Sequence, residues 1–181
     1  RQWKRFQQAH LPGAWSIPMT SRLGSYLGSF GDAEAPYIIV GEETEIEEVV
    51  RRMIRIGFDR IVGWFPSDKM ESSSRFDGSW LQVEEVAADQ VHSVIHSDDV
   101  KVLDVRRATE YQEEHISGAL NLSHTRLAAH LVEIDKDTTW HLMCETGDRS
   151  ERTASFLASR GYSVINLAGG MQNVRSGKVV R

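Results

Sequence analysis

The stretch WHLMCETGDRS, residues 140–150, decides the fold. Residues 140–143 form a short apolar run, which is typical of a buried strand in a parallel sheet. A loop with a glycine follows, and small and apolar residues recur at helical spacing over 150–160. A strand, a tight loop and a helix N-terminus predict an anion cradle, because backbone N–H groups converge there and the helix dipole adds partial positive charge.

Cys144 lies at the start of this loop and is the one cysteine of the chain. We expect the loop amides and Arg149 to favour the thiolate, which is the nucleophilic form of cysteine. Gly147 permits a turn that a side chain would block, and Ser150 can cap the helix. A lone thiol excludes an intrachain disulfide and a Cys-rich zinc site, and it fits a reducing compartment, so we expect a cytoplasmic protein.

Further elements follow from apolar patterns in the rest of the chain. Strands are predicted at 37–40, 100–105 and 163–166, and helices at 46–54, 80–92 and 150–160. Residues with helical spacing (Ile46, Val49, Val50, Met53, Ile54) and three positions in 80–92 (Leu81, Val83, Val86) are expected in the core. Gly57 and Gly161 stand where helix C-caps belong. Alternating strands and helices predict an α/β fold with a parallel sheet flanked by helices.

The amino-acid composition excludes some classes of function. The chain has 181 residues, 40% of them hydrophobic, with a formal net charge of −5. This balance supports a packed core and argues against nucleic acid or an anionic membrane as the main partner. No apolar run approaches the roughly 20 residues needed to span a bilayer. His92 and His96 lack a third ligand at suitable spacing, so neither a metal nor another cofactor is expected.

The chain also contains an internal repeat. Three segments match in order (10–18 with 115–123, 37–40 with 140–143, and 56–58 with 160–162), at offsets of 105, 103 and 104. His10 and His115 occupy equivalent positions, which predicts a shared structural role. The polar, turn-rich residues 66–78 read as a linker, so we expect domains at 1–78 and 79–181.

The first copy lacks the chemistry of the second. Gly41 stands where the second copy has Cys144, and an acidic run without arginine replaces the loop. This copy is therefore expected to be catalytically silent. Aligning the copies puts Arg1 opposite Arg106, so the first copy lacks the preceding strand, and we expect residues upstream of it in the natural protein.

The second copy, over about residues 80–175, resembles the rhodanese domain. The resemblance rests on an ordered set of motifs: Val102–Arg106, Glu110-Tyr111, His115–Ala119, Cys144-x4-Arg149-Ser150, Gly161-Tyr162 and Gly169–Met171. It implies two rhodanese-like domains, the first incomplete at its N-terminus. It also implies that Cys144 carries sulfur as a persulfide and that Arg149 supports the loop and the anionic sulfur. The loop from Glu145 through Thr146, Gly147 and Asp148 to Ser150 would hold the persulfide and the incoming anion, with Asp104 and Arg106 in support near the strand end.

The resemblance implies a sulfurtransferase. Sulfane sulfur would move from thiosulfate or a low-molecular-weight persulfide to Cys144, and then to a thiol, sulfite or cyanide acceptor. A silent copy followed by an active one is also similar to the C-terminal part of proteins that fuse a metallo-β-lactamase-like domain to tandem rhodaneses. Those proteins resemble persulfide dioxygenases of sulfide detoxification, so a metal-binding domain upstream is an expectation.

Three alternatives stay open. A phosphatase or arsenate reductase on the same fold would use a loop one residue longer than the six residues from Cys144 through Arg149, so loop length favours sulfur transfer. The domain could instead present a persulfide to a partner without catalysis, or Cys144 could be an inert core thiol. Glu145 and Asp148 oppose thiolate formation and repel thiosulfate if they face the mouth of the loop, and the sequence leaves their orientation open.

Overall fold

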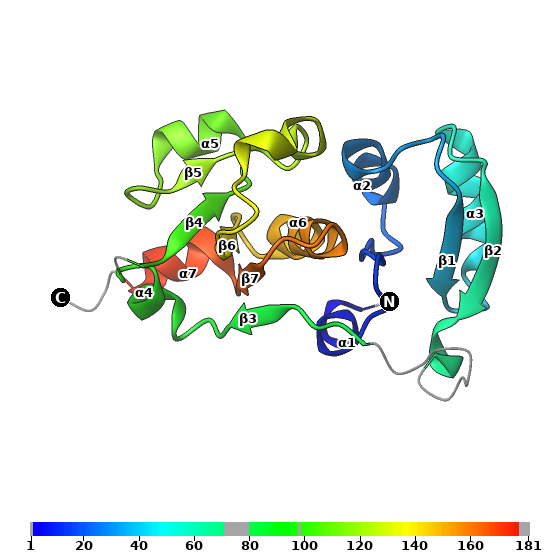
Figure 1. The fold of residues 1–181 in the computed structure, drawn as a ribbon, viewed down its shortest axis with the longest axis horizontal. Helices are drawn as coiled ribbons and strands as arrows, with labels where there is room; N and C mark the ends of the chain where they lie inside the picture. The colour runs from blue at the N-terminus through cyan, green and yellow to red at the C-terminus, as the bar shows by residue number, and fades with distance from the viewer. Residues whose placement is uncertain (1, 71–79, 98, 178–181) are drawn as a thin grey trace.

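The computed structural model describes residues 2–70, 80–97 and 99–177. Parallel strands alternate with helices, as predicted for an α/β fold (Figure 1). A small sheet contains β1 (Tyr37–Gly41) and β2 (Ile61–Pro66). A larger sheet has the order β3 (Glu84–Val86), β7 (Val164–Leu167), β6 (Trp140–Met143), β4 (Lys101–Asp104), β5 (Leu120–Asn121).

Helices connect and cover these strands. In chain order they are α1 (Trp3–Gln8), α2 (Leu23–Phe30), α3 (Ile46–Arg55), the short η1 (Ser67–Lys69), α4 (Val91–Val94), α5 (Ala108–Glu113), η2 (Leu127–Glu133), α6 (Asp148–Ser159) and α7 (Gly170–Gly177). Among the helices of the described residues, none combines the length and the apolar character needed to cross a membrane.

The inner strands of the larger sheet were predicted correctly. They carry the fully buried Leu103, Leu142 and Leu167, as expected of a parallel sheet covered on both faces. The chain passes from β4 to β5 on one side and from β6 to β7 on the other. The carboxyl ends of β4 and β6 therefore meet at a switch point, which is where α/β sheets form their ligand crevice. Cys144 directly follows β6 at this point.

The predicted helix over 80–92 is wrong. Residues 84–86 form β3, which pairs with β7, and a helix begins only at Val91. Val83 is buried as expected and Val86 is half-buried, but Leu81 is 41% exposed. The backbone of Leu81 instead exchanges two hydrogen bonds of 2.9 Å with that of His10. Pairing with distant segments therefore overrides the local pattern here.

The first part of the N-terminal segment (residues 2–70), with α1 and α2, packs against the larger sheet and its helix α6. Its buried aromatic residues Trp3, Phe6, Tyr26 and Phe30 belong to the same hydrophobic cluster as the inner strands and α6. The rings of Phe30 and Phe156 stack with centroids 4.7 Å apart. The expected boundary near residue 78 lies outside the described residues, so the division at 78 stays a prediction.

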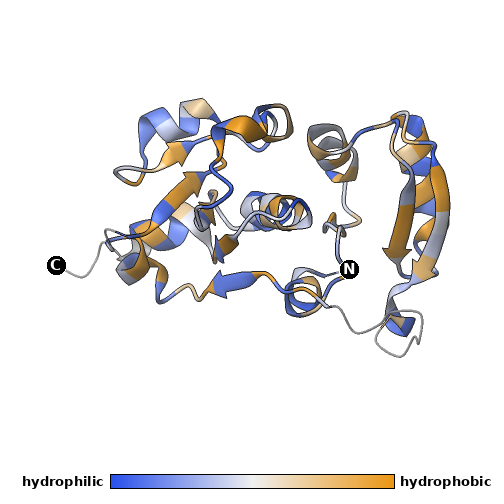
Figure 2. Cartoon of the chain, viewed as in Figure 1, coloured by the Kyte–Doolittle hydropathy of each residue, from blue (hydrophilic) through white to orange (hydrophobic). Residues whose placement is uncertain are grey.

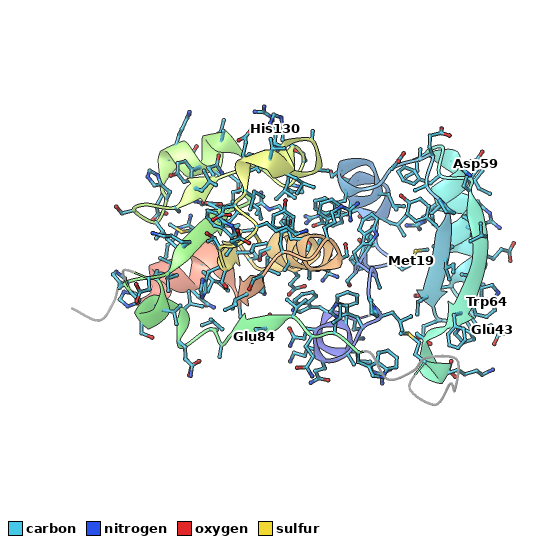
Figure 3. All side chains as sticks on the ribbon, viewed as in Figure 1. Met19, Glu43, Asp59, Trp64, Glu84 and His130 are labelled. Carbon is cyan, nitrogen blue, oxygen red and sulfur yellow. The ribbon has the colours of Figure 1, made fainter. Side chains whose placement is uncertain are left out.

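The small sheet buries one face. Leu23, Met53 and Phe58 form a cluster against this face, and Figure 3 shows Met19 on the side of β1 toward the larger sheet. Figure 2 shows that both strands are strongly apolar, yet Ile38 and Val62 are each 68% exposed on the other side. Figure 3 also shows Trp64 and Glu43 at one end of this sheet.

The helix predicted over 46–54 is confirmed as α3, and its residue Met53 is buried. Ile54, however, was expected in the core and is 53% exposed, so that part of the stripe is wrong. The apolar residues of α3 extend around the helix beyond the face that packs against the small sheet.

Geometry recurs at the positions of the internal repeat. The imidazole Nδ1 of His10 lies 3.0 Å from the carbonyl of Phe6, and that of His115 lies 2.8 Å from the carbonyl of Tyr111. Each imidazole also stacks on the ring of that same aromatic residue, with centroids 4.2 and 4.0 Å apart. The glycines Gly13 and Gly118, three residues after each histidine, share a φ of 78°. The predicted C-cap glycines Gly57 and Gly161 likewise have φ of 83° and 79°.

Candidate active site

Cys144 is held inside the loop that connects β6 to α6. The Gly147 backbone N–H donates a hydrogen bond to its Sγ at 3.1 Å. Cys144 itself is 0% exposed and belongs to the main hydrophobic cluster. We expected backbone amides to point at the sulfur, and the N–H of Gly147 does so. Because the thiol is fully buried, side chains must move before a sulfur donor can reach it.

Gly147 shapes the loop. Its φ of 108° lies in a region that side chains disfavour, and it is the N-cap of α6. The prediction that Ser150 caps this helix is wrong, because Ser150 lies within the first turn. Its buried hydroxyl donates instead to the carbonyl of Gly147 at 3.0 Å, and so braces the loop from inside.

The first residues of α7 form hydrogen bonds with the backbone of the Cys144 loop. The N–H of Met171 donates to the carbonyl of Cys144 at 2.8 Å, and that of Gln172 donates to the carbonyl of Glu145 at 3.1 Å. This approach requires glycine at position 170, where φ is 54° and an added Cβ would lie 2.2 Å from the carbonyl oxygen of Cys144. The helix therefore fixes the backbone on both sides of the Cys144–Glu145 peptide bond.

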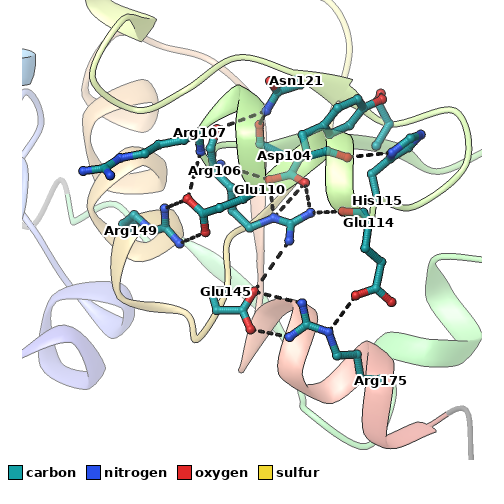
Figure 4. Close-up of polar contacts among 12 residues, drawn as sticks. Asp104, Arg106, Arg107, Glu110, Glu114, His115, Asn121, Glu145, Arg149 and Arg175 are labelled. Atoms are coloured by element: carbon teal, nitrogen blue, oxygen red, sulfur yellow. Dashed lines mark hydrogen bonds and ion pairs between the residues drawn. The ribbon is translucent and has the colours of Figure 1, made fainter.

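Arg149 forms a bidentate ion pair with Glu110 of α5. Its two terminal nitrogens each lie 2.7 Å from a carboxylate oxygen (Figure 4). The hydrogen bonds from Arg149 lower the pKa of Glu110 to about 2, and the same bonds raise the pKa of Arg149. Cys144 adds a further attraction for the guanidinium. Arg149 is therefore a positive charge that Glu110 holds in place and that attracts the thiolate of Cys144.

Glu145, whose orientation the sequence left open, pairs with arginines. Its carboxylate accepts hydrogen bonds from Arg175 of α7, and the Nη1 of Arg106 lies 3.5 Å from it (Figure 4). Arg175 also donates to Glu114 at 2.7 Å, and both glutamates raise its pKa. The negative charge beside Cys144 is thus compensated from two directions.

Asp104 and Arg106 form a buried ion pair at the end of β4. The Arg106 guanidinium donates to both carboxylate oxygens, at 2.7 to 3.0 Å, and to the carbonyl of Glu114 at 2.6 Å. The arginine and aspartate side chains are 1% and 0% exposed, respectively. Because Arg106 also faces Glu145, the pair connects the end of β4 to the loop. The supporting role expected of both residues in sulfur transfer stays a prediction.

Asp148, the other acidic residue of the loop, faces α2. Tyr26 donates its hydroxyl to the Asp148 carboxylate at 2.6 Å, and Arg22 donates to the same oxygen at 3.0 Å. Within α6, Arg152 lies 3.9 Å from the carboxylate. Thr146 at the loop tip is exposed. Of the loop residues whose amides were expected to bind substrate, Glu145 and Asp148 thus have side-chain partners on other elements.

His124 lies next to Tyr26, the residue that bonds Asp148 of the loop. Its ring is 6.1 Å from that of Tyr26, and its Nδ1 is 3.3 Å from the carbonyl of Val105. Burial lowers the pKa of His124, and the positive charges of Arg149 and Arg107 lower it further. The environment of His124 therefore favours its neutral form.

Several residues of this network were missed by sequence reasoning. Glu110 was part of the quoted motif, and its charge opposite Arg149 was a usable signal. Arg175, Glu114, Tyr26 and Arg22 carried no local signal, since each reaches the site only through the tertiary fold. In the described parts of the chain, no three His, Cys, Asp or Glu side chains lie close enough together to hold a metal ion.

The fold and the site together define a class: a parallel α/β domain with a buried cysteine in the strand–helix loop at the sheet's switch point. Comparison with known proteins gives the family. Residues 87–176 match the model of the rhodanese-like domain. The chain belongs to the rhodanese family.

Two individual relatives agree with this assignment. Thiosulfate sulfurtransferase PspE of Escherichia coli (strain K12) is 30% identical over 79 residues, which are 42% of this chain and 76% of PspE. Thiosulfate sulfurtransferase GlpE of Coxiella burnetii (strain RSA 331 / Henzerling II) is 35% identical over 75 residues, 41% of this chain and 70% of GlpE. The crystal structure of a rhodanese-related protein from Thermoplasma volcanium has a TM-score of 0.48 at 23% identity, covering 52% of this chain and 92% of that one.

Proposed function

We propose that the chain is a sulfurtransferase that carries sulfane sulfur as a persulfide on Cys144. The observation that carries this proposal is the hydrogen bond from the Gly147 N–H to Sγ at 3.1 Å, within a loop of six residues that ends at Arg149. A donor N–H on sulfur stabilises the anionic thiolate and would equally stabilise an anionic persulfide. The relatives named thiosulfate sulfurtransferase support the same chemistry.

The first half-reaction loads the sulfur. The Cys144 thiolate attacks the outer sulfur of thiosulfate, a new S–S bond forms, and the donor S–S bond breaks so that sulfite leaves with the electron pair. A low-molecular-weight persulfide reacts in the same way and releases its thiolate. Arg149 and the loop amides offset the negative charge as the donor approaches.

The second half-reaction unloads the sulfur. An acceptor thiolate, sulfite or cyanide attacks the outer sulfur of the persulfide, and the Cys144 thiolate leaves with the electron pair. The loop that stabilised the thiolate before the reaction stabilises it again as the leaving group. Two covalent half-reactions predict ping-pong kinetics.

Steady-state kinetics test the proposal. Initial rates with thiosulfate and cyanide should give parallel lines in double-reciprocal plots, and Cys144→Ser should abolish turnover. Activity that persists in Cys144→Ser, or no turnover with either thiosulfate or an organic persulfide, would contradict the proposal. Hydrolysis of an aryl phosphate or turnover of arsenate at Cys144 would instead support the phosphatase or arsenate reductase alternative.

We also propose that the N-terminal segment is a rhodanese-like copy that has lost its own sulfur chemistry. Support comes from the matching geometry of α1 with α5, where a histidine stacks on the aromatic residue four positions earlier. Gly41 ends β1 as Cys144 follows β6, so this copy offers no thiol.

A further inference from the structure

Helix α2 of the N-terminal segment reaches the loop that holds Cys144. Tyr26 and Arg22 both bond the same carboxylate oxygen of Asp148, 122 and 126 positions further along the chain. Tyr26 is 2% exposed, so its hydroxyl contact is built into the protein interior, whereas the Arg22 side chain is 66% exposed. Burial and the hydrogen bond to Asp148 both raise the pKa of Tyr26, so the hydroxyl stays protonated as a donor.

Several contacts fix α2 and the residues before it against α6. Phe30 stacks on Phe156, and the rings of Trp15 and Phe156 meet edge to face at 5.9 Å. Arg152 donates to the hydroxyl of Ser16 at 2.8 Å, and its side chain is only 4% exposed. The position of Tyr26 relative to Asp148 is therefore set by a packed interface.

Asp148 occupies a sensitive position. It is the first residue of α6 and directly follows Gly147, whose N–H bonds the sulfur of Cys144. A carboxylate without a partner here would oppose the thiolate and repel an anionic donor. Its charge is compensated chiefly by Arg22, the N-cap residue of α2, at 3.0 Å, since Arg152 of its own helix lies farther away, at 3.9 Å. Tyr26 of α2 adds a hydrogen bond to the same oxygen.

We propose that Tyr26 and Arg22 are positioning residues for sulfur transfer: they orient the carboxylate of Asp148 and offset its charge, so that the Cys144 loop stays fit to hold an anionic sulfur. The inference rests on the proposed function. It gives the N-terminal segment a part in the chemistry of a site that lies wholly in the other half of the chain.

Other ionisable groups also face this site and set the background for any pH measurement. They are Arg106 after β4, Glu110 of α5, His124, Glu145 of the loop, Arg149, Glu151 and Arg152 of α6, and Arg175 of α7. None of them is altered in the variants below, so differences between these variants report on Tyr26, Arg22 and Asp148.

The test is the pH dependence of alkylation of Cys144 by iodoacetamide in the folded protein. Tyr26→Phe should raise the midpoint pH by about half a unit or more, because it removes a hydrogen bond to Asp148 without removing the ring. Tyr37→Phe is the matched control, since the Tyr37 hydroxyl bonds the backbone of Asp32 in the same segment, and it should leave the midpoint unchanged. Arg22→Gln should shift the midpoint in the same direction with little effect on folding, because Arg22 is largely exposed.

Rescue separates positioning from simple packing. In the Tyr26→Phe/Asp148→Asn double variant the midpoint should return to that of Asp148→Asn alone, because the unneutralised charge is gone. An unchanged midpoint in Tyr26→Phe, or a shift that Asp148→Asn does not reverse, would overturn the inference. Alkylation does not require sulfur transfer, so failure of the proposed function would appear as lost turnover in the wild type, independently of these midpoints.

Discussion

The loops that follow β1 and β6 differ in nearly every feature that matters for chemistry. The loop after β6 starts with a buried cysteine, turns at Gly147 with φ of 108°, and ends with an arginine paired to Glu110. The loop after β1 follows Gly41, the last residue of the strand, and runs through four exposed residues, three of them acidic. Both loops lead from a parallel strand into a helix, α6 or α3, whose C-cap residue is directly followed by a glycine of positive φ.

The comparison teaches that the strand–loop–helix scaffold does not by itself create the site. A glutamate directly follows Cys144, and another directly follows Gly41, the equivalent position in the first copy. Each glutamate pairs with a residue of the segment that follows the next strand. Glu42 accepts a hydrogen bond from Ser67, whereas Glu145 pairs with Arg175 and Arg106. The arginines offset the negative charge of the Glu145 carboxylate.

The largest expected effect comes from moving the thiol. Cys144→Ser should reduce sulfur transfer on the order of a thousandfold or more, because the nucleophile is lost. Adding Gly41→Cys to that variant should restore nothing, since the first loop has no arginine. Turnover of thiosulfate by the double variant measures this, and recovery of activity would show that the scaffold alone suffices.

The second effect concerns the close approach of α7 to the loop. Gly170→Ala should destabilise the protein by about 1–3 kcal/mol, because alanine is strained at φ of 54° and its Cβ would collide with the carbonyl of Cys144. Gly41→Ala is the control, since a Cβ added there would meet no heavy atom within 4 Å, and it should stay within about 0.5 kcal/mol. Urea unfolding measures both, and equal stabilities would contradict the role of α7.

Much of this site could be predicted from the sequence, because its signals are local. Cys144, Gly147 and Arg149 lie within one strand–loop–helix stretch, and the inner strands carry continuous apolar runs. The orientation of Glu145 and Asp148 could not be predicted, since it depends on Arg175 and on α2. The strand at 84–86 was missed for the same reason: it exists through pairing with β7, about 80 residues away.

The third effect tests the arginine pairing of Glu145. Glu145→Gln should raise kcat/KM for thiosulfate about tenfold, because the negative charge beside Cys144 is lost while Arg175 and Arg106 keep their positive charges. Glu42→Gln removes the equivalent charge from the other loop and should leave kcat/KM unchanged. A fall in kcat/KM for Glu145→Gln would mean that the carboxylate contributes to catalysis instead of screening the arginines.

The smallest effect is the contribution of Glu110 to stability. Glu110→Gln should cost about 1 kcal/mol near neutral pH, because the pair with Arg149 is partly exposed. The pKa of Glu110 is lowered from 4.5 to about 2, so this contribution is complete above pH 4.5 and is lost as the pH falls through 2. Unfolding of both proteins as a function of pH should show their difference shrinking in acid, and a constant difference would contradict the pairing.

The central claim is that the loop after β6 makes Cys144 a sulfur acceptor. The most direct measurement is mass spectrometry of the Cys144 peptide after treating the folded protein with thiosulfate or an organic persulfide and trapping the product by alkylation. We expect the mass to rise by one sulfur atom, with the sulfur removed again by cyanide. No added sulfur with either donor, or the same labelling in urea-unfolded protein, would contradict the claim.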